Sequence, residues 1–165
     1  MPLFKKSQKT DPEAPGAPTA QAILKEGPLY ARWYILYRLE EEMERARRYN
    51  RPVAIIMVAA GTPLPVQPAN DQALQAAVET AKAMARSIDL LGWYSKDSFL
   101  TIMPETSQAD AEAAVSRWRN EMWLRSRALG GQKWRVAALQ SSDQFETAEQ
   151  FARAVREHLA LEDAA

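Results

Sequence analysis

The residues of this chain best suited to chemistry are an arginine and an aspartate three positions apart, Arg86 and Asp89. An arginine fork can bind a phosphate, and an aspartate can accept hydrogen bonds from a bound ligand. The pair also has a simpler interpretation, in which an arginine at the favourable end of a helix dipole pairs with the acidic residue that begins the next turn. The spacing alone does not choose between a ligand site and a structural ion pair.

The sequence has few residues that could form other kinds of functional site. The chain has no cysteine, which excludes disulfides, thiolate metal ligands and cysteine nucleophiles, and its single histidine, His158, is typical of an ordinary helix residue. Lysine plus arginine and aspartate plus glutamate both number 21, so the formal net charge is zero and no global field favours nucleic acid or an anionic membrane. Any nucleotide must be held by local charge, and we expect no nucleic-acid partner.

The length of 165 residues, 47% of them hydrophobic, suits one domain with a core. Residues 1–27 carry four prolines and no hydrophobic periodicity, which predicts a flexible tail before a domain over residues 28–165. No stretch approaches the roughly 18 apolar residues of a membrane span, and no apolar run follows the first lysines. We therefore expect a cytoplasmic protein without membrane insertion.

Hydrophobic spacing predicts helices and strands in alternation, with a proline-broken loop over residues 62–70. Ser107 with Asp110, and Thr147 with Gln150, resemble capping pairs at the start of two helices. An unbroken apolar run predicts a central strand buried on both faces. The predicted order is a helix around 36–46, a strand at 53–60, a helix from about 71, a hairpin of strands 90–94 and 99–103, a helix from 107, a strand at 134–139 and a last helix from 147. This mixture predicts an α+β sheet flanked by helices.

The tryptophans divide into two groups. Trp118 and Trp134 fall at positions compatible with a core. Trp33, Trp93 and Trp123 fall off the predicted apolar stripes and could equally form an apolar interface.

Two segments carry a family resemblance. Residues 41–52 (EEMERARRYNRP) and the strand after them resemble the opening of GGDEF domains, the diguanylate cyclases. Residues 86–106 (RSIDLLGWYSKDSFLTIMPET) are similar to that family's inhibitory RxxD motif, a strand, the GGDEF hairpin and a Pro-x-Thr triplet. The interval from Asp89 to Ser95 matches the family's spacing. The resemblance covers about residues 30–160 and implies a central, mostly antiparallel five-stranded sheet flanked by helices, with the ferredoxin-like or palm-type core of nucleotide cyclases.

The hairpin motif departs from the family pattern. The segment that stands in place of GGDEF lacks both glycines and the glutamate that follows the aspartate. A side chain at the glycine positions would crowd the space where the family's substrate approaches the backbone. The five residues of this segment are Ser95, Lys96, Asp97, Ser98 and Phe99.

The metal ligands implied by the resemblance are also replaced. Ala59 and Gly61 stand where the family has Asp-x-Asp at the end of its first strand. The loop over residues 61–71 is about five residues shorter than the family's and lacks the helix that carries a guanine-reading asparagine. Nucleotidyl transfer depends on cations held by such oxygen ligands. We therefore expect no metal, no cofactor, no catalytic residue and a chain that is not an enzyme.

The product-binding residues implied by the resemblance are retained. Arg86 and Asp89 match the RxxD motif, and Arg117 falls where the family often has a second arginine for the same ligand. The resemblance thus implies a signalling module that binds cyclic di-GMP at these residues, a protein partner, or both. The alternative is a scaffold for protein interaction or homodimerisation that binds no nucleotide.

Overall fold

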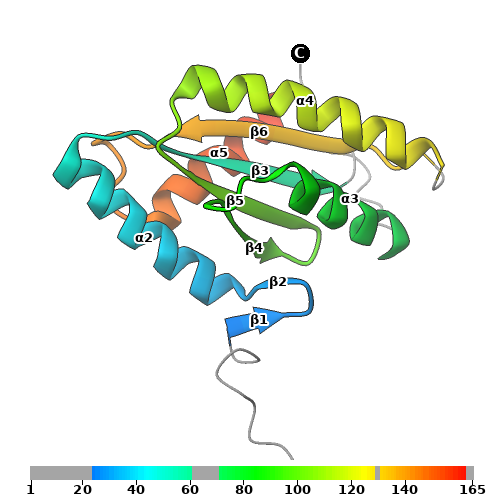
Figure 1. Cartoon of the computed structure of the whole chain (residues 1–165), viewed down its shortest axis with the longest axis horizontal. Helices are drawn as coiled ribbons and strands as arrows, with labels where there is room; N and C mark the ends of the chain where they lie inside the picture. Colours follow the sequence, from blue (N-terminus) through cyan, green and yellow to red (C-terminus); the bar gives the residue numbers. More distant parts are fainter. Residues whose placement is uncertain (1–23, 61–70, 129–130, 163–165) are drawn as a thin grey trace, which may run out of the picture.

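The computed structural model describes residues 24–60, 71–128 and 131–162, which form a mixed sheet between two pairs of helices (Figure 1). The strand order is β1-β2-β4-β5-β3-β6, and every pairing is antiparallel except that of β2 with β4. The strands are β1 (Lys25–Glu26), β2 (Leu29–Tyr30), β3 (Val53–Ala60), β4 (Leu90–Ser95), β5 (Ser98–Pro104) and β6 (Trp134–Gln140). The helices are α2 (Arg32–Tyr49), α3 (Asp71–Met84), α4 (Gln108–Arg127) and α5 (Ala148–Glu162).

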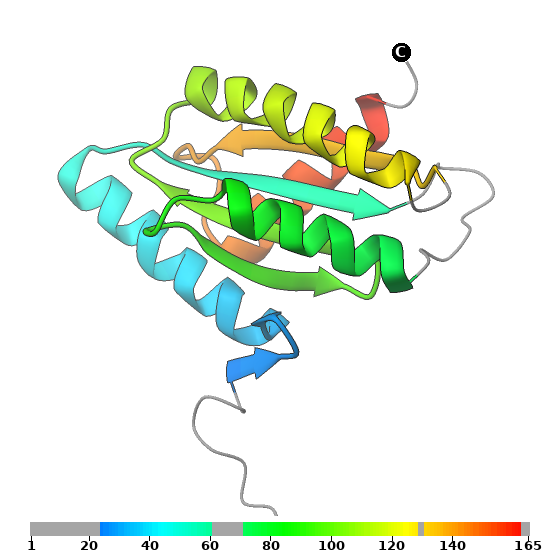
Figure 2. The same ribbon diagram turned by 45° about the vertical axis from the view of Figure 1, so that its right-hand side comes forward.

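The two faces of the sheet carry separate cores. Helices α3 and α4 cover one face, and α2 and α5 cover the other (Figure 2). All eight residues of β3 are buried; Ile56 and Val58 belong to the first core, and Ile55 and Met57 to the second. The alternation of side chains along a strand therefore turns one apolar run into two packed surfaces. The predicted central strand buried on both faces is confirmed.

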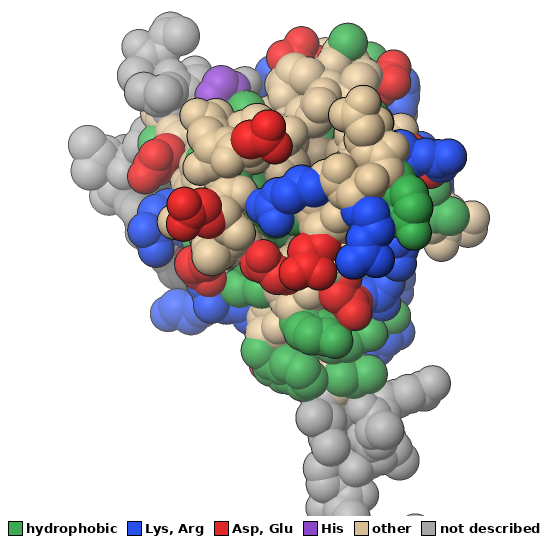
Figure 3. Space-filling model, turned by 90° about the vertical axis from the view of Figure 1, so that its left-hand side faces the viewer, with side chains coloured by type: hydrophobic (Ala, Val, Ile, Leu, Met, Phe, Trp, Pro, Cys, Tyr) green, Lys and Arg blue, Asp and Glu red, His purple; other side chains and the backbone are tan. Residues whose placement is uncertain are grey.

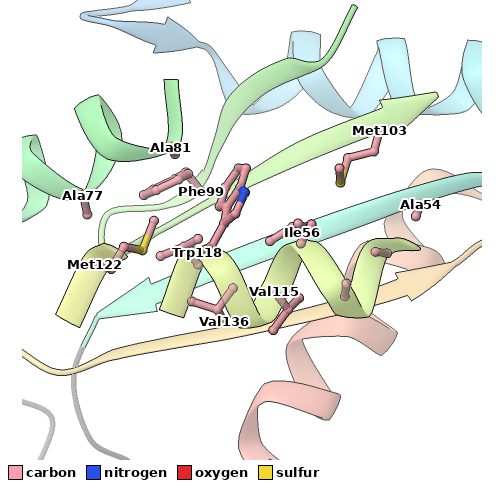
Figure 4. Close-up of a cluster of buried hydrophobic side chains, with 14 of the residues drawn as sticks. Ala54, Ile56, Ala77, Ala81, Phe99, Met103, Val115, Trp118, Met122 and Val136 are labelled. Atoms are coloured by element: carbon pink, nitrogen blue, oxygen red, sulfur yellow. The ribbon is translucent and has the colours of Figure 1, made fainter. Parts of the chain in front are cut away.

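The α3 and α4 core is built around large side chains from helix and sheet. Trp118 projects from α4 towards the sheet, among Phe99, Ile56 and Met122 (Figure 4). Trp118 and Phe99 are fully buried. Trp134 is half-buried and packs against the same cluster.

The α+β class and the flanked, mostly antiparallel sheet are confirmed, although the sheet has six strands where five were predicted. Strands β1 and β2 contain two residues each, too few for a hydrophobic period to reveal them. The sheet begins at Lys25, ahead of the predicted domain boundary at residue 28, and residues 1–23 lie outside the described residues. The Trp93 indole fixes this edge by donating from Nε1 to the Glu26 carbonyl at 2.7 Å.

Helix ends follow the residues predicted to cap them. Ser107 Oγ accepts a hydrogen bond from the Asp110 amide, and Thr147 Oγ1 accepts one from the Gln150 amide. Asn50 ends α2 in a left-handed conformation with φ of 52°.

Helix α2 crosses the sheet at unusually close range over Gly92. A Cβ atom on Gly92 would lie 2.3 Å from Ile35 Cβ, well inside any allowed contact. Gly92 therefore lets α2 lie against β4, next to the start of the hairpin. Among the described residues, no helix combines the length and hydrophobicity that a bilayer-spanning segment needs.

Candidate functional site

The RxxD turn joins the end of α3 to the start of β4. The Asp89 amide donates to the Arg86 carbonyl at 3.0 Å, and the Arg86 amide donates to Asp89 Oδ2 at 2.8 Å. An aspartate readily closes a turn in this way, because its short carboxylate reaches the nearby backbone. The motif therefore has a local structural role before any ligand is considered.

The Arg86 side chain extends this turn into a network. Its Nη2 and Nε atoms donate to Asp89 Oδ1 at 2.9 Å and 3.2 Å. The same Nη2 donates to the Pro104 carbonyl at 3.0 Å and to Thr106 Oγ1 at 2.7 Å, across β5. The guanidinium thereby links the RxxD turn to the segment that leads into α4.

The two members of the motif differ sharply in exposure. The Asp89 side chain is 1% exposed, whereas that of Arg86 is 47% exposed. The Asp89 oxygens already accept from Arg86, so this carboxylate orients the guanidinium. Within the described part of the chain, Arg86 Nη1 donates to no protein group. A fixed guanidinium with one open edge is suited to a phosphate oxygen or a guanine acceptor.

Arg117 is not part of this hydrogen-bonded pair. It is exposed on α4, just before the buried Trp118. Its place in the helix is about 14 Å along the axis from Gln108 at the amino end. The structure joins Arg86 to Asp89 but shows no hydrogen bond or ion pair from Arg117 to either of them.

The hairpin segment forms a two-residue turn, Lys96 and Asp97, between β4 and β5. Ser95 Oγ and Ser98 Oγ share a hydrogen bond of 2.6 Å across the turn, and Ser95 Oγ also accepts from the Asp97 amide at 3.3 Å. Ser98 is buried, and so is Phe99, whose ring meets Trp93 edge-on at 6.3 Å. The predicted hairpin is therefore present, closed by serine hydroxyls.

The tip of the hairpin lies beside the end of β3. Ala59 pairs with Ser98, and the Ala60 amide donates to the Asp97 carbonyl at 2.9 Å. Asp97 is thus an acidic residue next to the end of β3. In residues 24–60, 71–128 and 131–162, no three His, Asp or Glu side chains gather as a metal site. Gly61 and the loop after it lie outside the described residues.

The sequence did not indicate that Thr106 and Glu105 belong with the RxxD turn. Thr106 meets Arg86 across 20 residues of sequence. Glu105 has a left-handed backbone, with φ of 53°, and forms an ion pair with Arg51. The sequence did show the Pro-x-Thr triplet that contains Thr106. Its position next to Arg86, however, follows from the pairing of strands in the sheet.

A cavity of about 430 Å³ adjoins the RxxD turn. Ile88 of the turn and Pro104 form part of its wall, and three arginines from the α2 side reach it. All three are in ion pairs, with Glu41, Glu42 and Glu105 respectively. The arginines are Arg38, Arg45 and Arg51.

This geometry has counterparts among solved structures. The GGDEF domain of DgcB from Caulobacter crescentus, in complex with c-di-GMP, superposes with a TM-score of 0.73 over 86% of this chain and 90% of that one, at 13% identity. This chain has the GGDEF domain fold. No protein-family model and no curated protein matches it.

Two further GGDEF structures agree. Diguanylate cyclase SiaD from Pseudomonas aeruginosa, in complex with its activator SiaC, has a TM-score of 0.69 and 22% identity, covering 82% of this chain. The match spans only 55% of the SiaD chain. The active GGEEF domain of a diguanylate cyclase from Vibrio cholerae has a TM-score of 0.67 and 11% identity, covering 78% of this chain and 87% of that one.

These GGDEF neighbours overturn the prediction that the chain is not an enzyme. SiaD and the Vibrio cholerae domain are diguanylate cyclases, which are enzymes, so that prediction is wrong. It relied on the replaced residues at Ala59 and Gly61, on the altered hairpin motif and on the shorter loop after the strand. Divalent cations also bind backbone carbonyl oxygens and water as ligands, so the loss of two carboxylates does not decide whether the chain is active.

Proposed function

We propose that this GGDEF-fold chain is a signalling module that binds cyclic di-GMP at the RxxD turn. The observation that carries the proposal is the state of Arg86, whose guanidinium is fixed by Asp89 and Thr106 while 47% of the side chain stays exposed. A group held in place before binding loses less entropy when the ligand arrives. Arg86 is the direct ligand contact, and Asp89 positions it.

The charge around the turn supports an anionic ligand. The chain has formal net charge zero, so attraction for two phosphates has to come from a local cluster. Each of the three arginines of the adjoining cavity is paired with a glutamate, so the positive charge offered to a ligand at the turn is that of Arg86. In this proposal Arg117 contacts the ligand only if the bound ligand reaches along α4 as far as that residue.

Calorimetric titration with cyclic di-GMP tests this function. We expect micromolar binding by the wild type and at least a tenfold loss for Arg86→Ala, equivalent to about 1.4 kcal/mol. Arg153→Ala is the matched control, because Arg153 is an exposed arginine on α5. Absence of heat for the wild type, or equal binding by wild type and Arg86→Ala, would refute the proposal. A thermal melt of each variant separates lost binding from lost folding.

A second candidate function is a protein-interaction or dimerisation scaffold that binds no nucleotide. Its supporting observation is the exposure of large aromatic side chains, with Trp33 at 55% and Trp123 at 51%. SiaD was solved with a protein activator, which provides an analogy for such a role. This alternative predicts self-association or partner binding in a protein that gives no heat with cyclic di-GMP. A cytoplasmic location and the lack of a nucleic-acid partner stay predictions from composition.

A further inference from the structure

Two acidic residues are buried within residues 24–60, 71–128 and 131–162. One is Asp89 in the RxxD turn, and the other is Glu42 on α2, whose side chain is 7% exposed. At the surface, by contrast, acidic and basic side chains lie next to one another in a mixed band, seen in Figure 3 on the side where α2 ends. A buried carboxylate costs free energy unless it is paired or bound to a ligand, so the partners of these two residues matter.

The Asp89 carboxylate has its partners within the turn. Its Oδ1 accepts from Arg86 Nη2 at 2.9 Å, and its Oδ2 accepts from the Arg86 amide at 2.8 Å. With 1% of its side chain exposed, Asp89 offers no oxygen to a ligand. The turn therefore presents a guanidinium, which only donates hydrogen bonds, whereas a guanine base also carries N1–H and N2–H donors that need an acceptor.

Glu42 has an acceptor oxygen to spare. Its Oε1 accepts from Arg45 Nη1 at 2.8 Å. In the described part of the chain no hydrogen bond reaches Glu42 Oε2, and this oxygen is not sealed away from solvent. Glu42 lines the cavity of about 430 Å³ beside the turn, together with Ile88 and Pro104. The cavity is therefore the place where Oε2 can meet a ligand.

We propose that Glu42 determines the base specificity of the cyclic di-GMP site by accepting hydrogen bonds from N1–H and N2–H of one guanine. The inference rests on the proposed function at Arg86. Arg86 holds a phosphate at the turn while the base enters the cavity, against the apolar atoms of Ile88 and Pro104. The cavity volume lies in the range of small-ligand sites, roughly 300 to 1,000 Å³. Hydrogen bonds to a carboxylate are about twice as strong as neutral ones, so one residue can set the preference.

A carboxylate at this position selects guanine over adenine. Adenine has an unprotonated N1 where guanine has N1–H, so an adenine base would place an acceptor against the Glu42 oxygens. A site built to bond a donor rejects an analogue that lacks it, because the buried acceptor is then left unpaired. A glutamine side chain offers one donor and one acceptor, which suits the adenine edge. The residue at position 42 thus sets which base is bound.

Calorimetric titration with cyclic di-GMP, cyclic di-AMP and cyclic di-IMP tests the inference. Cyclic di-IMP carries hypoxanthine, which keeps N1–H and lacks the N2 amino group. For the wild type we expect cyclic di-GMP to bind at least about tenfold more tightly than cyclic di-AMP and about fivefold more tightly than cyclic di-IMP. For Glu42→Gln we expect the preference over cyclic di-AMP to shrink by at least about tenfold and the difference from cyclic di-IMP to disappear.

Two control variants separate base recognition from the ion pair of Glu42. Arg45→Gln removes the same ion pair but keeps the carboxylate, so it should retain the preference for guanine. Glu44→Gln removes an exposed carboxylate of the same helix and should leave all three affinities as in the wild type. Circular dichroism melts verify that each variant is folded.

The outcomes distinguish this inference from the function on which it rests. A wild type that binds no cyclic di-GMP would refute both. A wild type that binds all three ligands equally, or a base preference that is unchanged in Glu42→Gln, would refute only the role of Glu42. The same holds if Arg45→Gln loses the preference as fully as Glu42→Gln does. If Glu42→Gln does not fold, the wild-type comparison of cyclic di-GMP with cyclic di-IMP decides, because equal affinities would overturn the inference.

Discussion

Arg86 Nη2 donates to Thr106 Oγ1 at 2.7 Å, and this hydrogen bond joins the RxxD turn to the segment that begins α4. Thr106 is buried, and its amide also donates to the Pro52 carbonyl at 3.1 Å, next to the start of β3. The turn, β5 and the entry to β3 are therefore connected through one threonine. Any ligand that moves the Arg86 guanidinium must disturb this connection.

Thr106→Val removes the hydroxyl while keeping the shape of the side chain. Arg86 then keeps Asp89 and the Pro104 carbonyl but loses its shortest partner. We expect the free energy of unfolding to fall by about 1 to 2 kcal/mol, because one buried hydrogen-bonding position is lost. We also expect cyclic di-GMP affinity to fall about fivefold, since a less rigid guanidinium binds less well. Denaturant titration and calorimetry measure the two effects, and wild-type affinity in this variant would show that the threonine does not position Arg86.

Gly92→Ala should be strongly destabilising. The added Cβ would overlap Ile35 Cβ, so α2 has to move away from β4. We expect a loss of about 1 to 3 kcal/mol, the usual range for overpacking a core. Chemical denaturation measures it. Adding Ile35→Ala should not restore stability, because the alanine keeps the Cβ atom that is overlapped; full rescue by that second change would contradict the close crossing.

The sequence predicted most of the fold and only part of the site. β3 and the hairpin were predictable because apolar runs and a polar turn have local signatures in the sequence. Ser107 and Thr147 likewise indicated where the helices that they cap begin. Strands β1 and β2 were missed because two residues are too few to show a period. The contact between Arg86 and Thr106 depends on strand pairing, which spacing along the chain does not encode. The prediction about catalysis was wrong because it inferred the absence of activity from replaced motif residues, although backbone carbonyls and water can also hold divalent cations.

Thr101→Val should be neutral or stabilising. Thr101 is fully buried on β5, and its Oγ1 has no hydrogen-bond partner among the described residues. Replacing an unsatisfied hydroxyl by a methyl group removes a desolvation cost, so we expect a gain of up to about 1 kcal/mol. Thr106→Val is the natural comparison, since it makes the same change at a bonded hydroxyl. If denaturation showed the two variants equally destabilised, the difference in their hydrogen bonding would be refuted.

Glu41→Gln should lower the pKa of Tyr37 towards 10.0. The Glu41 carboxylate raises that pKa, because a phenolate next to a negative charge is disfavoured and the neutral phenol donates to the carboxylate. Removing the charge makes the phenol easier to ionise, so its titration should move to lower pH. Tyrosine ring-carbon NMR follows this titration, with Tyr37→Phe to assign the signal. Glu44→Gln serves as the control because it leaves Glu41 in place. An unchanged Tyr37 titration in Glu41→Gln would show that Glu41 is not the neighbour that raises the pKa.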